Sequence, residues 1–291
     1  MGTTQAGGGA TVRRLLLGTQ LRKLREARGV SREEAGYSIR ASESKISRME
    51  LGRVGFKERD VADLLTLYGV EVEQERATVL GLLRDANASS WWHEYGDVLP
   101  GWFQNYLGLE EAAAEIRSYE VQFVHGLLQT ADYARAVVTA GGHAHGPEEI
   151  ERRVDVRRKR QAVLTGERAP RLVAVLDEAA LRRPWGGPEL MRGQLDRLLE
   201  LSELPNVRLQ VLPLGNAGLS AESGAFTVLG FAEAELSDVV YLEQFTTALY
   251  LDKPAEVAEY RHAMDDLVAD SLSPALTRDL LHSVRQELGR V

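Results

Sequence analysis

The N-terminal part of the chain alternates short amphipathic stretches with single glycines. Leu21 and Leu24 recur at helical spacing before Gly29, and four further stretches of the same kind follow. Apolar residues three or four positions apart form one face of a helix, and glycine readily adopts the left-handed conformation in which helices end. The pattern predicts a compact domain of five helices over residues 12–86, after a flexible start at residues 1–11.

The next segment, residues 87–170, is expected to stay largely helical. Pro100 and Gly101 divide its aromatic first part, and Thr130 and Pro147 are typical residues for the start of a helix. We therefore expect helices and connecting loops up to Pro170.

Strand patterns begin after Pro170. The runs RLVAVLDE and NVRLQVLPL flank the amphipathic helix pattern GPELMRGQLDRLLELSEL, so their two strands are expected to be parallel. GAFTVLGF and DVVYLEQF predict two more strands, TALYL an edge strand, and the C-terminal segment two helices. The predicted fold is multidomain: an all-α five-helix domain, then an α+β domain over residues 87–291 that is helical in 87–170 and has a mixed sheet with helices in 171–291.

The composition excludes several kinds of site and gives no sign of a membrane or secreted protein. The chain has no cysteine, which excludes disulfides, thiolate metal sites and cysteine nucleophiles. No apolar run approaches the ~18 residues of a membrane helix, and the first residues lack an apolar signal core. We expect a cytoplasmic, nucleoid-associated protein without a membrane partner.

Charge is unevenly distributed along the chain. Residues 1–60 contain 13 Lys+Arg and 7 Asp+Glu, a balance of +6, whereas the other 231 residues contain 22 and 36, a balance of -14, which together give the net charge of -8. This asymmetry indicates a basic N-terminal part that meets phosphates and an acidic remainder that does not.

Residues 20–53 carry the strongest functional pattern. Ser31, with Glu34 three residues later, matches a capping box, Ser42 is a second N-cap candidate, and Gly52 ends the second short helix. Two short capped helices that are joined by a tight turn form a helix-turn-helix.

The second helix of this pair has the side chains of a DNA-reading helix. Ser44, Ser47 and Arg48 share its outer face, while Ile46 and Met49 form the opposite, buried face. Hydroxyls and arginine can bond to base edges, and the N–H groups at the start of the first helix, with nearby cations, suit phosphates. The expected DNA-binding residues are Ser31, Arg32, Ser42, Glu43, Ser44, Lys45, Ser47, Arg48, Arg53 and Lys57.

These residues also have an ordinary structural interpretation. Ser31 and Ser42 act as helix caps in either case, and a single lysine or arginine is more often a solvated surface residue. The joint pattern of capped helices, apolar anchors and local positive charge favours a double-stranded DNA operator as the partner. A homodimer is expected, because one short recognition helix contacts few base pairs.

The stretch LGTQLRKLREARGVSREEAGYSIRASESKISRMELGR resembles the helix-turn-helix of phage-repressor-like regulators of the xenobiotic-response-element type. Within it, SKISRME is similar to the core of that family's recognition helix. The resemblance implies a five-helix domain that binds DNA as a dimer. The chain departs from the family at Ser31-Arg32, where the first motif helix usually opens with Ser-Gln, and Arg32 is expected to substitute for the glutamine.

Longer stretches resemble the actinobacterial regulators called Scr1-like, whose large C-terminal domain is of unknown function. They are WWHEYGDVLPGWFQNYLGLEEAAAEIRSYE, GLLQTADYARA, LDEAALRRPWGGPELMRGQL and NVRLQVLP. The resemblance implies a transcriptional regulator that acts with a small acidic partner protein, in an arrangement likened to toxin–antitoxin pairs. One departure is VHGLLQT, in which His125 stands where proline is expected.

The aromatic segment forms a second candidate site. Its residues can line a ligand pocket or a protein interface, where tryptophan and tyrosine are enriched, and His93 would supply a polar group. Helical spacing favours the other interpretation, a core that joins the helical segment to the sheet. The candidates for a ligand or partner are Trp91, Trp92, His93, Tyr95, Trp102 and Tyr106.

Signals for an enzyme are weak. The sequence has no phosphate-binding glycine loop, no dinucleotide fingerprint and no nucleophile elbow, so we expect no catalytic residue, cofactor or metal. His143 and His145 are interpreted as solvated loop residues. Asp177, which follows a predicted strand, is interpreted with Glu178 as the start of a helix, although ligands bind at such strand ends in open α/β sheets.

The sequence thus predicts a DNA-binding transcription regulator whose C-terminal domain mediates dimerisation and responds to a small partner protein or a small-molecule effector. One alternative is an antitoxin-like protein whose C-terminal domain neutralises a small partner, which an exposed apolar patch in residues 91–130 would favour. The other is an enzyme tethered to DNA, with a site near Asp177.

Overall fold

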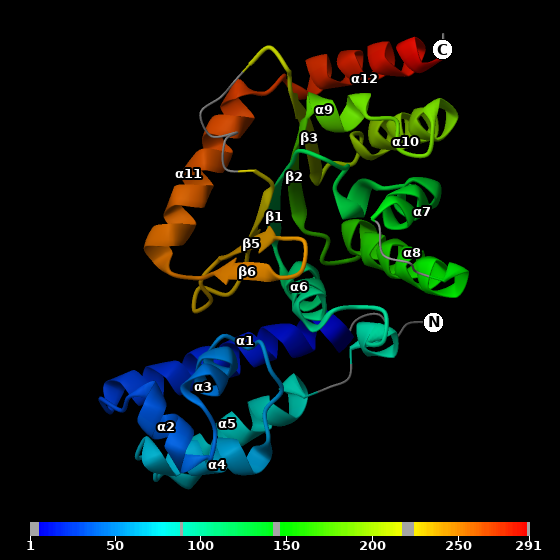
Figure 1. Cartoon of the computed structure of the whole chain (residues 1–291). Coiled ribbons are helices and arrows are strands. Elements are labelled where there is room, and N and C mark those ends of the chain that lie inside the picture. Colours follow the sequence, from blue (N-terminus) through cyan, green and yellow to red (C-terminus); the bar gives the residue numbers. More distant parts are fainter. Residues whose placement is uncertain (1–5, 88–89, 142–145, 217–223, 290–291) are drawn as a thin grey trace. The chain divides into compact units, whose positions relative to one another are not determined.

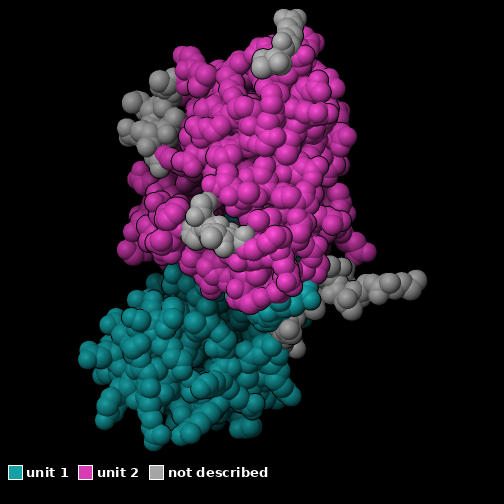
Figure 2. Space-filling model, turned by 45° about the vertical axis from the view of Figure 1, so that its right-hand side comes forward, with its two compact units in different colours: residues 1–94, 104–112, 233–236 teal, residues 95–103, 113–232, 237–291 magenta. Residues whose placement is uncertain are grey.

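A computed structural model of the chain describes residues 6–87, 90–141, 146–216 and 224–289. The chain divides into two compact units, which Figure 2 distinguishes by colour. The first unit comprises residues 1–94, 104–112 and 233–236, and the second comprises residues 95–103, 113–232 and 237–291. The predicted fold class is confirmed, because an all-helical N-terminal region is followed by a mixed sheet with flanking helices.

The N-terminal region contains the five predicted helices (Figure 1). They are α1 (Ala6–Ala27), α2 (Arg32–Ser38), α3 (Glu43–Glu50), α4 (Glu58–Leu67) and α5 (Glu73–Ala86). Gly29, Gly52 and Gly69 follow α1, α3 and α4 with φ of 70°, 61° and 74°. Because this left-handed conformation is costly for other residues, these glycines allow the chain to turn directly after each helix.

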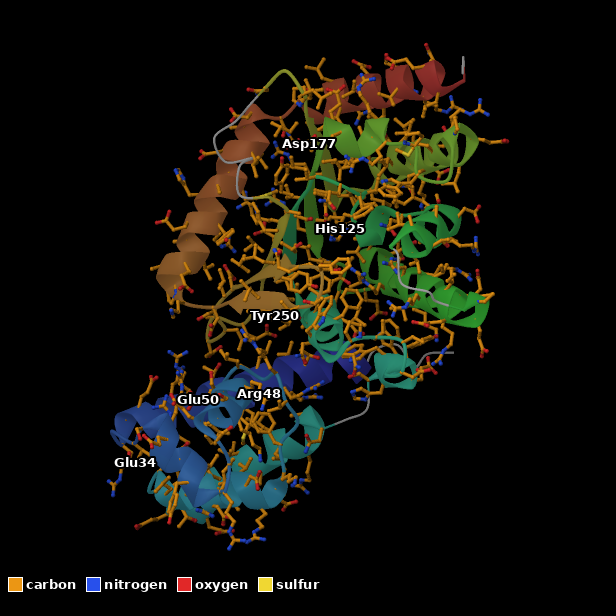
Figure 3. All side chains as sticks on the ribbon, viewed as in Figure 1. Glu34, Arg48, Glu50, His125, Asp177 and Tyr250 are labelled. Atoms are coloured by element: carbon orange, nitrogen blue, oxygen red, sulfur yellow. The ribbon has the colours of Figure 1, made fainter. Side chains whose placement is uncertain are left out.

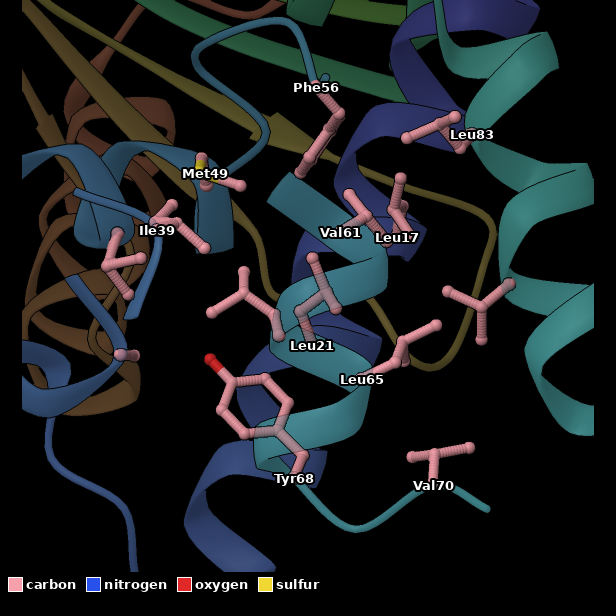
Figure 4. Packing of buried hydrophobic residues seen from close by; sticks show 14 of the residues in the cluster. Leu17, Leu21, Ile39, Met49, Phe56, Val61, Leu65, Tyr68, Val70 and Leu83 are labelled. Atoms are coloured by element: carbon pink, nitrogen blue, oxygen red, sulfur yellow. The ribbon is translucent and has the colours of Figure 1, made fainter. Parts of the chain in front are cut away.

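One apolar core holds these helices together (Figure 4). Leu17 and Leu21 of α1 pack with Met49 of α3 and with Val61 and Leu65 of α4. Each such side chain is almost fully buried, and burial of one leucine or valine stabilises a fold by about 1.5–3 kcal/mol.

Helix α1 starts earlier than the sequence predicts. Residues 1–11 were expected to be flexible, but α1 already begins at Ala6. Thr11 is buried, and a Cβ atom on Gly108 of helix α6 (Gly101–Ala112) would lie only 2.6 Å from its Oγ1. Thr11, at the end of this segment, therefore packs against a helix almost one hundred residues later in the chain.

The second unit contains a six-stranded sheet with the order β3-β2-β1-β4-β5-β6. Its strands are β1 (Glu115–Glu120), β2 (Arg171–Asp177), β3 (Val207–Leu212), β4 (Phe226–Gly230), β5 (Val239–Glu243) and β6 (Ala248–Leu251). β1, β2 and β3 are parallel, while β4, β5 and β6 join by antiparallel pairs. The predicted parallel pair around helix α10 (Pro188–Leu201) and the predicted edge strand β6 are both confirmed.

The sequence pattern misassigned strand β1. Residues 115–120 were expected to belong to a helical segment, but they form a strand between β2 and β4. Ile116, Ser118 and Tyr119 are buried, while the charged residues between and beside them are not. The charged residues at both ends and the buried Ser118 interrupt the alternation of apolar and polar residues that is typical of a strand. The strand forms because β2 and β4 pair with this segment.

Helices cover both faces of the sheet (Figure 1). Helix α11 (Pro254–Asp270) packs on one face, where Val257, Met264 and Leu267 contact Tyr119 and Val240. Helices α7 (Ala131–Ala140), α8 (Pro147–Gln161) and α10 lie on the other side, with the short α9 (Glu178–Arg182) and α12 (Pro274–Leu288) near β3.

The outer edge of β3 is covered by the connection between α11 and α12. The N–H of Leu272 donates to the Val211 oxygen at 2.9 Å, and the N–H of Val211 donates to Thr277 Oγ1 at 3.1 Å. These bonds satisfy backbone groups that an edge strand otherwise exposes.

His125 has a structural role in the second unit (Figure 3). It is buried, and its Nδ1 accepts from the N–H of Leu127 at 3.3 Å. It thereby caps the short 3-10 helix Gly126–Leu128, which a proline could not do through its side chain.

Candidate nucleic-acid interface

The predicted capping box at the start of α2 is present. Ser31 Oγ accepts from the N–H of Glu34 at 3.1 Å, and the N–H of Ser31 donates to Glu34 Oε2 at 2.8 Å. These bonds hold the pKa of Glu34 below its usual value, since they stabilise the carboxylate. The first motif helix therefore begins at a fixed residue, as the sequence indicates.

The turn between α2 and α3 brings the two helices close together. A Cβ atom on Gly36 would lie 2.8 Å from the Ala41 oxygen, and Arg40 takes a left-handed φ of 55°. Ser42 then caps α3, because its Oγ accepts from the N–H of Lys45 at 3.2 Å. The result is a tight helix-turn-helix in which α3 is the second helix of the motif.

Helix α3 has a buried face and an exposed face. Ile46 and Met49 are buried in the core, whereas Ser44 and Arg48 are exposed and Ser47 is partly exposed. The Nε of Arg48 donates to the Ser44 oxygen at 3.3 Å, so the side chain of Arg48 lies along the helix. Ser42 and Glu43, at the start of α3, are exposed as well.

The cations around α3 differ in their contacts within the chain. Lys45 Nζ lies 2.6 Å from Asp60 Oδ2, and Arg32 Nε lies 3.0 Å from Glu50 Oε2. Arg53 is partly exposed, and Lys57 is exposed just before α4. Lys45 and Arg32 are therefore each paired with a carboxylate within the chain.

A buried ionic cluster behind α3 was not expected from the sequence. The guanidinium of Arg25 on α1 donates to both oxygens of Glu50 and, at 2.9 Å, to the Val30 oxygen. The hydrogen bond with Glu50 raises the pKa of Arg25. Burial, with the negative charge of Glu50, raises the pKa of Tyr68 to about 12. Because Glu50 also binds Arg32, one carboxylate connects α1, α2 and α3.

Two family models match the chain. A model described as helix-turn-helix domain matches residues 16–79, a range that contains α2 and α3. A model described as domain of unknown function (DUF5753) matches residues 103–283, which is more than half of the chain and contains all six strands. The chain belongs to the DUF5753 family. It therefore joins a DNA-binding domain of the regulator type to a DUF5753 domain.

The matches support a helix-turn-helix regulator in general. They do not reach the narrower Scr1-like assignment, which stays a prediction. No curated protein and no solved structure matches the chain.

The aromatic candidates fall into different units. In the first unit, Trp92 and Tyr106 are buried, and the rings of Trp91 and Trp92 meet edge to face with centroids 5.6 Å apart. Burial, with the charge of nearby Arg14, lowers the pKa of His93. These contacts agree with an apolar core, the interpretation that helical spacing favours.

Tyr95 and Trp102 belong to the second unit. The Tyr95 hydroxyl donates to Asp155, and Lys159 lies 4.7 Å from the centre of its ring. The backbone oxygen of Trp102 accepts from the Tyr250 hydroxyl (Figure 3). In residues 91–130, all of which the structure describes, no large hydrophobic side chain is exposed. The patch that would favour an antitoxin-like protein is therefore missing there.

Asp177 starts a helix, as its position after the strand suggests. Its Oδ1 accepts from the N–H of Ala179 at 2.8 Å, and its Oδ2 accepts from the Tyr119 hydroxyl at 3.3 Å. Glu178 accepts from Arg182 at 2.5 Å and from the N–H of Leu214 at 3.0 Å. Both carboxylates therefore accept hydrogen bonds from neighbouring groups of the fold.

The described residues contain no group of three or more metal-ligating side chains, and within them no helix is long and apolar enough to cross a membrane. The loop histidines, His143 and His145, lie outside the described residues, as does most of the loop GNAGLSAESG.

Proposed function

We propose that this protein is a sequence-specific transcription regulator whose helix α3 reads the major groove of an operator. The proposal rests on the two faces of α3, one of which packs in the apolar core while the other is exposed to solvent. Ile46 and Met49 fix its position in the core, and Ser44, Ser47 and Arg48 lie outside the core. Hydroxyls and a guanidinium are groups that hydrogen-bond to base edges.

Contacts to phosphate would position this helix. Arg53 and Lys57 follow α3 directly and suit the flanking backbone, whereas Arg32 and Lys45 would exchange a carboxylate for a phosphate. The local balance of +6 in residues 1–60 supports this role, because the acidic remainder disfavours other contacts with DNA.

The C-terminal DUF5753 domain is proposed to mediate dimerisation and to respond to an effector. A helix of eight residues contacts few base pairs, so two copies on adjacent half-sites supply the missing specificity. The resemblance to Scr1-like regulators supports a small acidic partner protein. We propose no enzymatic activity, since Asp177 and Glu178 are occupied by structural contacts.

In the test, the full chain first selects a DNA duplex from a pool of random sequences. Fluorescence anisotropy then measures the affinity of the chain for this selected duplex. Ser44→Ala with Arg48→Ala should reduce affinity for the selected duplex at least about thirtyfold, since each of the two base contacts is worth about 1–3 kcal/mol. Affinity for a scrambled duplex should fall far less.

Arg84→Ala is the matched control, because Arg84 is an exposed arginine of α5, outside the helix-turn-helix. It should keep the affinity of the unaltered chain within about threefold. Equal losses in Arg84→Ala and in the double variant would contradict the assignment of the reading face.

A further inference from the structure

A polar cavity of about 460 Å³ lies between helices α10 and α12 of the second unit. The two helices pack side by side (Figure 1), and Arg285 Nε of α12 lies 2.6 Å from Asp196 Oδ1 of α10. Cavities of about 300–1,000 Å³ commonly hold small ligands. The volume between α10 and α12 is therefore sufficient for a small molecule.

Arg192 extends from α10 toward the end of α12. A Cβ atom on Gly289, directly after α12, would lie 3.4 Å from Arg192 Nη1. The C-terminal end of a helix carries partial negative charge, which favours a guanidinium at this place. Arg192 lines the cavity and is partly exposed, and no described residue hydrogen-bonds to its guanidinium or forms an ion pair with it.

Glu189 lines the same cavity three residues before Arg192. This spacing often gives an ion pair on a helix, and Arg197 and Glu200 of α10 form one at 3.1 Å. Glu189 pairs neither with Arg192 nor with any other residue in the described ranges. The cavity therefore contains a guanidinium and a carboxylate on one helix that do not bond to each other.

The formal charges around the cavity cancel. Arg192 and Arg285 supply two positive charges, and Glu189 and Asp196 supply two negative charges. Gln286 adds an exposed amide that can both donate and accept hydrogen bonds. A lining of this kind suits a polar ligand that carries both signs of charge and no net charge.

Two glycines leave the space between the helices open. Gly193 lines the cavity from within α10, and a Cβ atom at this position would meet nothing within 4 Å. Glycine is less favourable inside a helix than a residue with a side chain, so packing between α10 and its neighbours does not require it here. Gly289 likewise lines the cavity without a side chain.

We propose that this cavity binds a small zwitterion, such as an amino acid or a dipeptide. The fork of N–H groups on Arg192 donates two hydrogen bonds to the carboxylate or phosphate of the ligand, and the ligand's ammonium group donates to Glu189. Residues three positions apart on a helix have Cβ atoms about 5–6 Å apart, so one short molecule reaches both side chains. This inference rests on the proposed function, because it names the class of effector to which the C-terminal domain responds.

The test is titration calorimetry of the full chain with three probes: glutamine, glycylglycine and phosphoethanolamine. Each probe is compared with its N-acetylated form, which keeps the anionic group and loses the positive charge. We expect at least one probe to bind with one molecule per chain, and its acetylated form to bind at least about tenfold more weakly. Absence of saturable binding by all three probes would overturn the proposal.

Arg192→Met should raise Kd for the bound probe at least about tenfold, because the anionic group loses its charged donor. Arg192→Lys keeps the charge but loses the fork, so it should bind several times more weakly than the unaltered chain. Arg197→Met is the matched control, since Arg197 lies on α10 but does not line the cavity. Equal values of Kd for Arg192→Met and Arg197→Met would contradict the site.

Glu189→Gln separates recognition of the ammonium group from recognition of the anion. It should raise Kd for the bound probe about fivefold or more and leave Kd for the acetylated form within about twofold. The same change in Kd for both forms would overturn the assignment of a zwitterion.

Gly193→Gln tests the location of the ligand without removing a charge. Glutamine is preferred to glycine in a helix, so the midpoint of thermal unfolding should stay the same or rise. Its side chain would occupy the cavity, and Kd for the probe should rise at least about tenfold. Unchanged binding by this stable variant would place the ligand elsewhere and overturn the proposal.

Failure of this inference differs from failure of the proposed function. A probe that binds in the cavity but leaves the affinity for operator DNA unchanged would keep the site and contradict only its role as an effector site. Absence of specific DNA binding by the unaltered chain would contradict the proposed function and leave zwitterion binding intact.

Discussion

Glu50 is a single buried residue that links three helices of the helix-turn-helix unit (Figure 3). Its side chain is 2% exposed, and its two oxygens accept from Arg25 and Arg32. A buried ion pair adds little net stability when it is intact, because desolvation offsets much of the attraction. The loss of one partner is different, since it leaves an uncompensated charge in the core.

Glu50→Gln should therefore lower the free energy of unfolding of the helix-turn-helix unit by about 3–5 kcal/mol. Urea unfolding followed by circular dichroism would measure this change. Glu58→Gln, at an exposed position of α4, is the control and should change the free energy by less than about 0.5 kcal/mol. Similar stabilities of the two variants would refute a structural role for the Glu50 cluster.

Among the helices, the position of α3 depends on a close approach of its backbone to that of α1. A Cβ atom on Gly18 of α1 would lie 2.5 Å from the oxygens of Met49 and Glu50, at the C-terminal end of α3. This distance is shorter than any ordinary contact between a Cβ atom and the backbone. If residue 18 gains a side chain, α1 and α3 must therefore move apart.

Gly18→Ala should destabilise the protein by about 1–3 kcal/mol and weaken specific binding to the selected duplex. Gly81→Ala in α5 is the matched control, because a Cβ atom there meets nothing within 4 Å. In a helix interior, alanine is preferred to glycine, so the control should gain up to about 1 kcal/mol. Thermal unfolding and anisotropy would compare the two, and a stable, fully binding Gly18→Ala would contradict the close approach.

At the scale of the whole molecule, a basic reading domain is joined to an acidic domain. The balance of +6 in residues 1–60 contrasts with -14 in the other 231 residues. Such a chain is expected to meet DNA only through its N-terminal part. We therefore expect sequence specificity to come from two N-terminal domains bound to adjacent half-sites, rather than from a larger contact by one chain.

Light scattering of the full chain on the selected duplex should give two chains of 32.2 kDa each per duplex. The half-sites should lie about 34 Å apart, which is one turn of DNA. A duplex with one scrambled half-site serves as the control and should lose most of the affinity. Full affinity for this control, with one chain bound, would contradict the dimer.

Local signals predicted most elements because their causes are local. Ser31, Glu34 and Ser42 cap helices through residues three positions away, and Gly29, Gly52 and Gly69 end helices by their own backbone freedom. The amphipathic pattern also gave the presented face of α3, which depends only on helical geometry.

Long-range contacts decided the rest. Ile116 and Tyr119 lie on β1, which is a strand because β2 and β4 pair with it, and Thr11 of α1 is buried against α6. The cluster around Glu50 joins residues of three helices.

The order of most elements and the helix-turn-helix therefore follow from the amino-acid sequence alone, since each depends on a few neighbouring residues, and the uneven charge can be counted directly from it. Which polar residues are buried together depends on the folded chain, because burial joins segments that are distant in sequence.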